Sequence, residues 1–109
     1  MVAIEAEKKL LNERYKEIIS SAKVVLIMKG NPKFPMCGLS STVCWLLKKN
    51  KIDFAPIDIL ADPEFYEFLR SLHGPEVFPY MYVQGNFIGG YDKIVSLLES
   101  GEFFNLYNL

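Results

Sequence analysis

The apolar residues of the chain follow helical spacing in some segments and strand spacing in others. Over residues 4–22 they recur along one face of a helix, while charged residues occupy the opposite face. That apolar face consists of Leu11, Tyr15, Ile18 and Ile19. The next segment, 23–28, reads KVVLIM, a β-branched run typical of a buried strand. The first pattern predicts a helix and the second a strand.

The segments that follow predict a loop, a helix and another strand. The loop is indicated by three residues that break regular structure, Gly30, Pro32 and Pro35. Apolar residues then return at helical spacing, so a helix is expected to begin near Cys37 and run to about Lys49. Residues 51–59, KIDFAPIDI, alternate in the manner of a strand.

The second half of the chain predicts a helix, a hairpin and a final helix. Asp62-Pro63 is typical of a helix start. Residues 80–90, YMYVQGNFIGG, read as two strands joined by a turn at Gly85-Asn86. Asp92 then has the character of an N-cap for the last helix.

The order of these elements defines an α/β fold. The first strand–helix–strand unit requires a crossover and therefore parallel strands, whereas the hairpin is antiparallel. One mixed four-stranded sheet flanked by helices accommodates both, and this is the thioredoxin-like architecture. Residues 1–109 are expected to form one domain, because the length suits a single core and half of the residues are hydrophobic.

Composition and charge narrow the classes of function. A net charge of −1 without a basic stripe argues against nucleic acid as a partner. The longest apolar run, 24–28, falls far short of the roughly 20 residues of a membrane span. Two cysteines are too few for a disulfide scaffold and favour reduced thiols. With no signal or transit peptide recognised, we expect a cytoplasmic protein, with mitochondria or nucleus as alternatives.

Cys37 is the candidate reactive residue. In the first turn of its predicted helix, unpaired N–H groups and the helix dipole favour the thiolate, and Lys29 across the loop adds positive charge. The alternative is an inert, buried cysteine. Cys44 lies seven residues further along, a helical rise of about 10.5 Å, so the two thiols cannot form a disulfide within one molecule. Cys44 is expected to pack in the core, and Ser40 stands where a nearer second cysteine would be.

Three segments resemble the monothiol glutaredoxins. MKGNPKFPMCGLS, 28–40, is similar to the family signature MKGxPxxPxCGFS. DILADPEFYEFL, 58–69, resembles DILxDPExRxxL, and FPYMYVQGNFIGGYD, 78–92, resembles xPQLYVNGEFVGGxD. The resemblance covers nearly the whole chain in register.

The resemblance implies two cofactors and a shared site. Members of this family bind glutathione beside the active cysteine, and two protomers then hold one [2Fe–2S] cluster. A cluster needs four sulfur ligands, and the family supplies one cysteine and one glutathione sulfur from each protomer. For this chain the resemblance implies Cys37 as the metal ligand, a homodimer when the cluster is bound, and acceptor proteins as partners.

The resemblance also implies which residues bind glutathione. Lys29, and Arg70 in some members, contact the glycyl carboxylate. The cis proline of Phe78-Pro79 presents backbone to the ligand. Gly89-Gly90-Tyr91-Asp92 receives the γ-glutamyl end, with Asp92 meeting its ammonium and helix N–H groups its carboxylate.

Each of these residues also has a purely structural interpretation. Lys29 and Arg70 are also explained as solvated surface residues, Pro79 as the residue that opens a strand, and Asp92 as an N-cap alone. His73, the only histidine, matches no functional position and is expected at the surface or in a turn.

Several positions depart from the family pattern. Leu39 replaces the Phe of CGFS, Tyr66 stands where Arg is common, and Val77 replaces Thr. Pro75-Glu76 takes the place of Trp-Pro, and Tyr91 the place of a common cysteine. Glutaredoxin domains of multidomain thioredoxin–glutaredoxin fusions also lack that cysteine, and LNERYKEII resembles their lead-in helix. The chain is therefore also interpretable as one domain of such a fusion.

Three functions follow from the resemblance. The first is a carrier that binds glutathione and a dimer-bridging [2Fe–2S] cluster, acting in cluster transfer and redox homeostasis. The second is a glutathione-dependent thiol–disulfide oxidoreductase working through one thiol, with at most weak turnover. The third is a degenerate glutaredoxin-fold module that only binds partners, which Tyr66, Val77 and the missing Trp-Pro favour.

Overall fold

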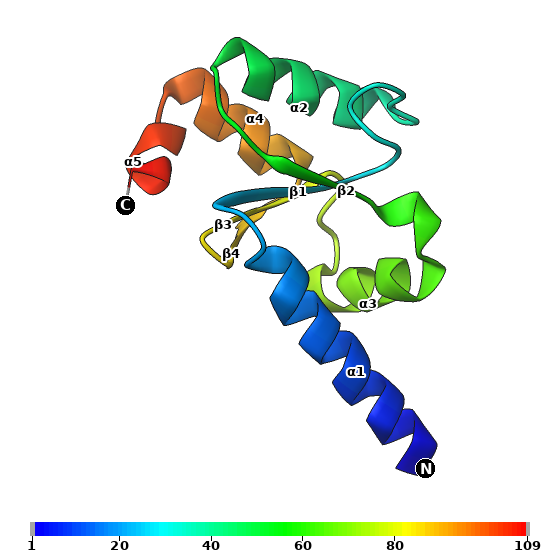
Figure 1. The fold of residues 1–109 in the computed structure, drawn as a ribbon. Coiled ribbons are helices and arrows are strands. Elements are labelled where there is room, and N and C mark those ends of the chain that lie inside the picture. Colours follow the sequence, from blue (N-terminus) through cyan, green and yellow to red (C-terminus); the bar gives the residue numbers. More distant parts are fainter. Residues whose placement is uncertain (1, 109) are drawn as a thin grey trace.

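The computed structural model describes residues 2–108 and contains a four-stranded sheet between two layers of helices (Figure 1). The strands are β1 (Val24–Met28), β2 (Ala55–Asp58), β3 (Tyr80–Val83) and β4 (Asn86–Gly89). The helices are α1 (Val2–Ile19), α2 (Gly38–Lys49), α3 (Pro63–His73), α4 (Tyr91–Ser100) and α5 (Phe103–Tyr107). A short 3-10 turn, η1 (Ile59–Ala61), joins β2 to α3.

The sheet has the order β2-β1-β3-β4 and confirms the mixed arrangement expected from the sequence. Strand β1 pairs parallel to β2 and antiparallel to β3, and β3 pairs antiparallel to β4. The crossover through α2 connects the parallel pair, as the strand–helix–strand pattern predicted. This is the thioredoxin-like architecture.

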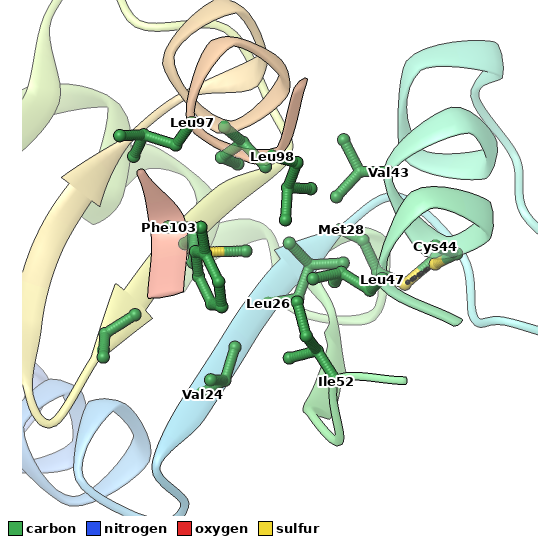
Figure 2. Close-up of a cluster of buried hydrophobic side chains, with 13 residues drawn as sticks. Val24, Leu26, Met28, Val43, Cys44, Leu47, Ile52, Leu97, Leu98 and Phe103 are labelled. Carbon is green, nitrogen blue, oxygen red and sulfur yellow. Dashed lines mark hydrogen bonds between the residues drawn. The ribbon is translucent and has the colours of Figure 1, made fainter. Parts of the chain in front are cut away.

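One face of the sheet packs against α2, α4 and α5 (Figure 2). Alternate residues of β1 point to this side, since successive side chains of a strand face opposite ways. The cluster they form with the helices is fully or almost fully buried and includes Leu26, Met28, Leu47, Ile94 and Phe103. All five residues of β1 are buried, so this strand is covered on both faces.

The opposite face packs against α1 and α3 and is rich in aromatic rings. Phe65 and Leu69 of α3 cover Val25 and Ile27 of β1. His73 ends α3 within this layer, with its ring stacked on Phe87 at a centroid distance of 3.6 Å.

His73 is half-buried at the end of α3, where the sequence indicated a surface or turn position. Its Nε2 lies 2.5 Å from the hydroxyl of Tyr82, which is itself fully buried. Burial lowers the pKa of His73, and the charge of Glu76 opposes that effect. The sequence around His73 did not predict this packing, because the aromatic rings that contact it lie on β3 and β4.

Other differences from the predicted elements lie at their ends. The hairpin turn is at Gln84-Gly85 rather than Gly85-Asn86, and both residues have positive φ (51° and 80°), as a type I′ turn requires. Strand β2 is shorter than the predicted 51–59. The periodicity gave no indication of α5. No helix among the described residues is long and apolar enough to cross a membrane.

Asp62 begins α3, as predicted. Its Oδ1 accepts a hydrogen bond of 3.1 Å from the N–H of Phe65, and Pro63 follows at the first helical position. Its other oxygen forms an ion pair with Arg14 of α1. The residue therefore both caps one helix and links it to another.

Replacing Asp62 separates these two roles. We expect Asp62→Ala to lower the free energy of unfolding by about 1 kcal/mol, because the cap is lost. Asp62→Asn keeps an acceptor and should cost less, since an ion pair that is still partly open to solvent contributes only about 0–1 kcal/mol. Urea unfolding of both variants measures the difference. Equal losses in the two variants would assign the stabilisation to the ion pair instead.

Candidate thiol site

Cys37 is the N-cap of α2, in extended conformation with φ −153° and ψ 132°. The backbone N–H of Ser40 lowers the pKa of the thiol most. Partial burial opposes this, while the N–H of Leu39, the charge of Lys29 and the Ser40 hydroxyl lower the pKa further. The helix start therefore stabilises the thiolate, as the sequence position predicted.

The loop before Cys37 is held against the ends of β1 and β2. Gly30, at φ +87°, donates its N–H to Oδ1 of Asp58 at 3.0 Å. The N–H of Met36 returns to the carbonyl of Lys29 at 3.0 Å. A Cβ on Gly30 would lie 2.5 Å from the carbonyl oxygen of Phe34, so only glycine fits. These contacts fix where the chain enters α2, and so where the thiol lies.

Ser40 has a structural role in this site, although the sequence indicated only that it stands where a second cysteine would be. Its side chain is fully buried, and its hydroxyl accepts a hydrogen bond of 3.1 Å from the N–H of Lys29. It thereby joins the end of β1 to the first turn of α2. This role could have been recognised in the sequence, because Ser40 falls on the same face of the predicted helix as the apolar residues that are buried.

Cys44 packs in the core, as expected (Figure 2). Its Sγ lies 3.6 Å from Sδ of Met28, and burial raises the pKa of its thiol. Both cysteines are free. Among the described residues, no three histidine, cysteine or acidic side chains gather as a metal-binding group.

Lys29, which follows β1, lies beside a short stack of aromatic rings. Its ammonium is 5.8 Å from the ring centroid of Tyr66 and 5.9 Å from that of Phe78. Phe78 in turn stacks on Tyr80 at 4.0 Å. Lys29 thus contacts the Phe78 ring, and its charge also lowers the pKa of Cys37. Tyr66, where arginine is common in the family, forms one wall of this group.

The segment before β3 is joined to the start of α4. The Phe78-Pro79 peptide bond is cis, as the resemblance implied. The carbonyl of Val77 accepts a hydrogen bond of 2.9 Å from the N–H of Tyr91. A Cβ on Gly90 would lie 2.5 Å from the same carbonyl oxygen, which explains a glycine there.

Asp92 is not the N-cap of α4. Gly90 holds that position, and Asp92 lies exposed in the first turn of the helix. The N–H of Gly90 is instead bonded to Oε2 of Glu76 at 3.2 Å, a contact that the sequence did not suggest. The acidic residue that caps α4 comes from a different segment, so local sequence could not identify it.

Arg70 is exposed in the last turn of α3. Its charge opposes the rise in the pKa of Tyr80 that burial causes, which locates the guanidinium near that phenol. Tyr66 and Glu76 also act on the same phenol. Arg70 therefore lies at the edge of the aromatic group that Lys29 contacts.

Comparisons with known proteins agree with this geometry. Residues 24–88 match the glutaredoxin family. The chain is 41% identical over 96 residues to probable monothiol glutaredoxin 2 of Rickettsia conorii, covering 85% of this chain and 90% of that protein. It is 37% identical to glutaredoxin 3 of Danio rerio, covering 94% of this chain and 32% of that protein. The solution structure of reduced poplar apo GrxS14 aligns with a TM-score of 0.71 at 36% identity, covering 85% of each chain.

A mixed sheet that carries a thiol at a helix start and a cis-proline segment defines a thioredoxin-like thiol protein. The chain belongs to the glutaredoxin family, and its relatives place it among the monothiol members. It spans only 32% of the zebrafish relative and 19% of monothiol glutaredoxin-S11 of Oryza sativa, at 37% and 42% identity.

The shifted pKa of Cys37 can be measured by alkylation. In a Cys44→Ser background, we expect the iodoacetamide rate to reach its plateau at a lower pH in the folded protein than in denaturant, because folding favours the thiolate. Lys29→Gln should move the midpoint up only modestly, since the Ser40 backbone has the larger effect. Lys33→Gln, which removes an exposed charge from the same loop, serves as the control. Identical midpoints in the folded and unfolded protein would contradict the assignment.

Proposed function

We propose that this chain binds glutathione through Cys37 and shares a [2Fe–2S] cluster between two protomers, as a carrier in iron–sulfur transfer. The observation that carries the proposal is a single accessible thiol at a helix start, where the backbone lowers its pKa, with no second thiol in reach. Such a group is a sulfur ligand that needs partners from outside the chain.

Glutathione is proposed to lie across the thiol, the cis-proline loop and the start of α4. Lys29, and Arg70 at the edge of the same group, supply positive charge for the glycyl carboxylate. The Phe78-Pro79 segment offers backbone groups to an extended peptide. Gly90, Tyr91 and Asp92 form the end that receives the γ-glutamyl group, where Asp92 can pair with its ammonium.

The donor set of the chain fits a cluster only as half of a site. One thiolate is available per protomer, since Cys44 is buried against Met28. Four sulfurs then require two protomers and two glutathione thiols. The cluster is cargo in this proposal, and the chain's own residues bind glutathione and lower the pKa of the Cys37 thiol.

The same thiolate also supports the alternative activity, a thiol–disulfide exchange. The Cys37 thiolate would attack the glutathione sulfur of a mixed disulfide, and the substrate thiolate would leave. A second glutathione thiolate would then attack the glutathione sulfur bound to Cys37. That step forms oxidised glutathione and returns the Cys37 thiolate. The lowered pKa favours this chemistry, because the thiolate is the nucleophile.

The setting proposed for the chain follows from its relatives. We propose residues 1–109 as one glutaredoxin domain, which corresponds to part of the longer zebrafish and rice relatives. Iron–sulfur acceptor proteins are the proposed partners. We propose a reducing compartment, because it suits the free thiols, and we favour the cytoplasm. A Saccharomyces cerevisiae relative is named mitochondrial.

Anaerobic reconstitution with iron, sulfide and glutathione tests the carrier function. We expect a coloured dimer with visible charge-transfer absorption and one cluster for about two chains. Cys37→Ser should abolish the colour, because its only accessible thiolate is lost. Cys44→Ser is the matched control and should retain the colour.

Two results would refute the carrier. One is a colourless monomer, and the other is colour that survives Cys37→Ser. Rapid turnover of a glutathione mixed disulfide by the colourless protein, lost in Cys37→Ser, would assign the oxidoreductase function in its place.

A further inference from the structure

The carboxylate of Glu76 occupies a position that the proposed function leaves unexplained. It reaches the N-cap of α4 from a loop 14 residues earlier in the chain and accepts the hydrogen bond of Gly90 N–H at 3.2 Å. Gly90 is the N-cap of α4 and has no side chain with which to cap the helix. Glu76 therefore supplies the missing acidic cap from another segment.

The main chain holds Glu76 in this position. Its N–H donates to the carbonyl of His73 at 3.2 Å, and its carbonyl accepts from the Tyr80 hydroxyl at 3.0 Å. Gly90 lies so close that a Cβ there would be 2.9 Å from Oε2 of Glu76. The neighbouring hydrogen bond, from Tyr91 N–H to the carbonyl of Val77, holds the loop before β3 against the start of α4. The carboxylate is thus aimed at the helix start by contacts on both sides.

This contact changes the electrostatics of the helix start. The first amides of a helix attract an anion, both as hydrogen-bond donors and through the helix dipole. At α4, Gly90 N–H already meets a carboxylate and Tyr91 N–H meets a carbonyl. Asp92 adds a second negative charge in the first turn, and Lys93 follows it in the sequence. The carboxylate of a γ-glutamyl group arriving at this end would meet Glu76 at the Gly90 N–H, while its ammonium could pair with Asp92.

We propose that Glu76 is a specificity-determining residue that weakens binding of the glutamyl carboxylate of glutathione at the start of α4. The inference rests on the proposed glutathione function and names a determinant of affinity within that site. Glu76 competes with the ligand's α-carboxylate for the positive end of the helix. The site therefore discriminates against thiols that carry a free carboxylate at this end, relative to thiols that lack the γ-glutamyl group.

Comparing two ligands and two charge-removing variants tests this directly. Dissociation constants for reduced glutathione and for cysteinylglycine, which lacks the γ-glutamyl group, are obtained from amide chemical shifts. We expect Glu76→Gln to bind glutathione about two- to ten-fold more tightly, the size of one charge at a helix N-terminus. Cysteinylglycine should bind unchanged. The gain should shrink at high salt, because the effect is electrostatic.

Glu99→Gln removes the same charge from the exposed end of α4 and should leave both constants unchanged. Glu76→Gln retains an oxygen that can accept the Gly90 N–H, so the fold is kept, and urea unfolding verifies this. Glu76→Ala removes the oxygen as well and should also bind glutathione more tightly. Unchanged or weaker binding of glutathione to Glu76→Gln overturns the inference, as does an equal gain for both ligands.

The test also separates this inference from the function on which it rests. If glutathione binds the parent chain and Glu76→Gln equally, the glutathione site stands and only the role of Glu76 fails. If glutathione shifts no amide in either protein, the proposed glutathione function fails and the role of Glu76 fails with it.

Discussion

The complete burial of strand β1 is the constraint on which the site depends. Helices cover this strand on both faces, and it pairs with β2 and β3 along both edges. Its end therefore has one fixed position, and Lys29 follows it directly. The hydrogen bond from Lys29 N–H to the buried Ser40 hydroxyl links the end of β1 to the first turn of α2 and so fixes where α2 begins relative to β1. Because the core fixes β1, it also fixes the distance between the lysine and the helix-capped thiol.

The starts of α2 and α4 give the site its electrostatic character, and different groups occupy their N-cap positions. At α2 the cap position is filled by a thiol, so the partial positive charge of the helix favours the thiolate. At α4 the cap position is a glycine, and an acidic side chain from the preceding loop fills the vacant place. One helix start thus activates a nucleophile, while the other is already neutralised by the protein.

The sequence predicted most of the architecture because its local signals were strong. The strand run at 23–28 and the Asp62-Pro63 helix start correspond to β1 and α3. The position of Cys37 at a helix start predicted a lowered pKa, which depends on backbone geometry that the helix pattern already implies. The hairpin turn was displaced by one residue, because a non-glycine, Gln84, takes the first positive-φ position.

The remaining features depend on contacts between segments that are distant in the chain. The stacking of His73 on Phe87 and the bond from Gly90 to Glu76 each join a loop or helix end to a separate element. Periodicity describes one element at a time, so it could not pair these residues. The motif match supplied Phe78-Pro79 and Gly90 as site residues, but the acidic partner stands where the family pattern has another residue.

The separation of the two cysteines determines which covalent change disulfide formation at Cys37 produces. Cys37 caps α2, and Cys44 is buried against Met28, so no disulfide can close between these two cysteines. A disulfide at Cys37 must therefore include a sulfur from outside residues 1–109. Such oxidation adds mass to the chain and leaves its internal covalent connections unchanged. An intact-mass spectrum would register this change, whereas a search for internal cross-links would find none.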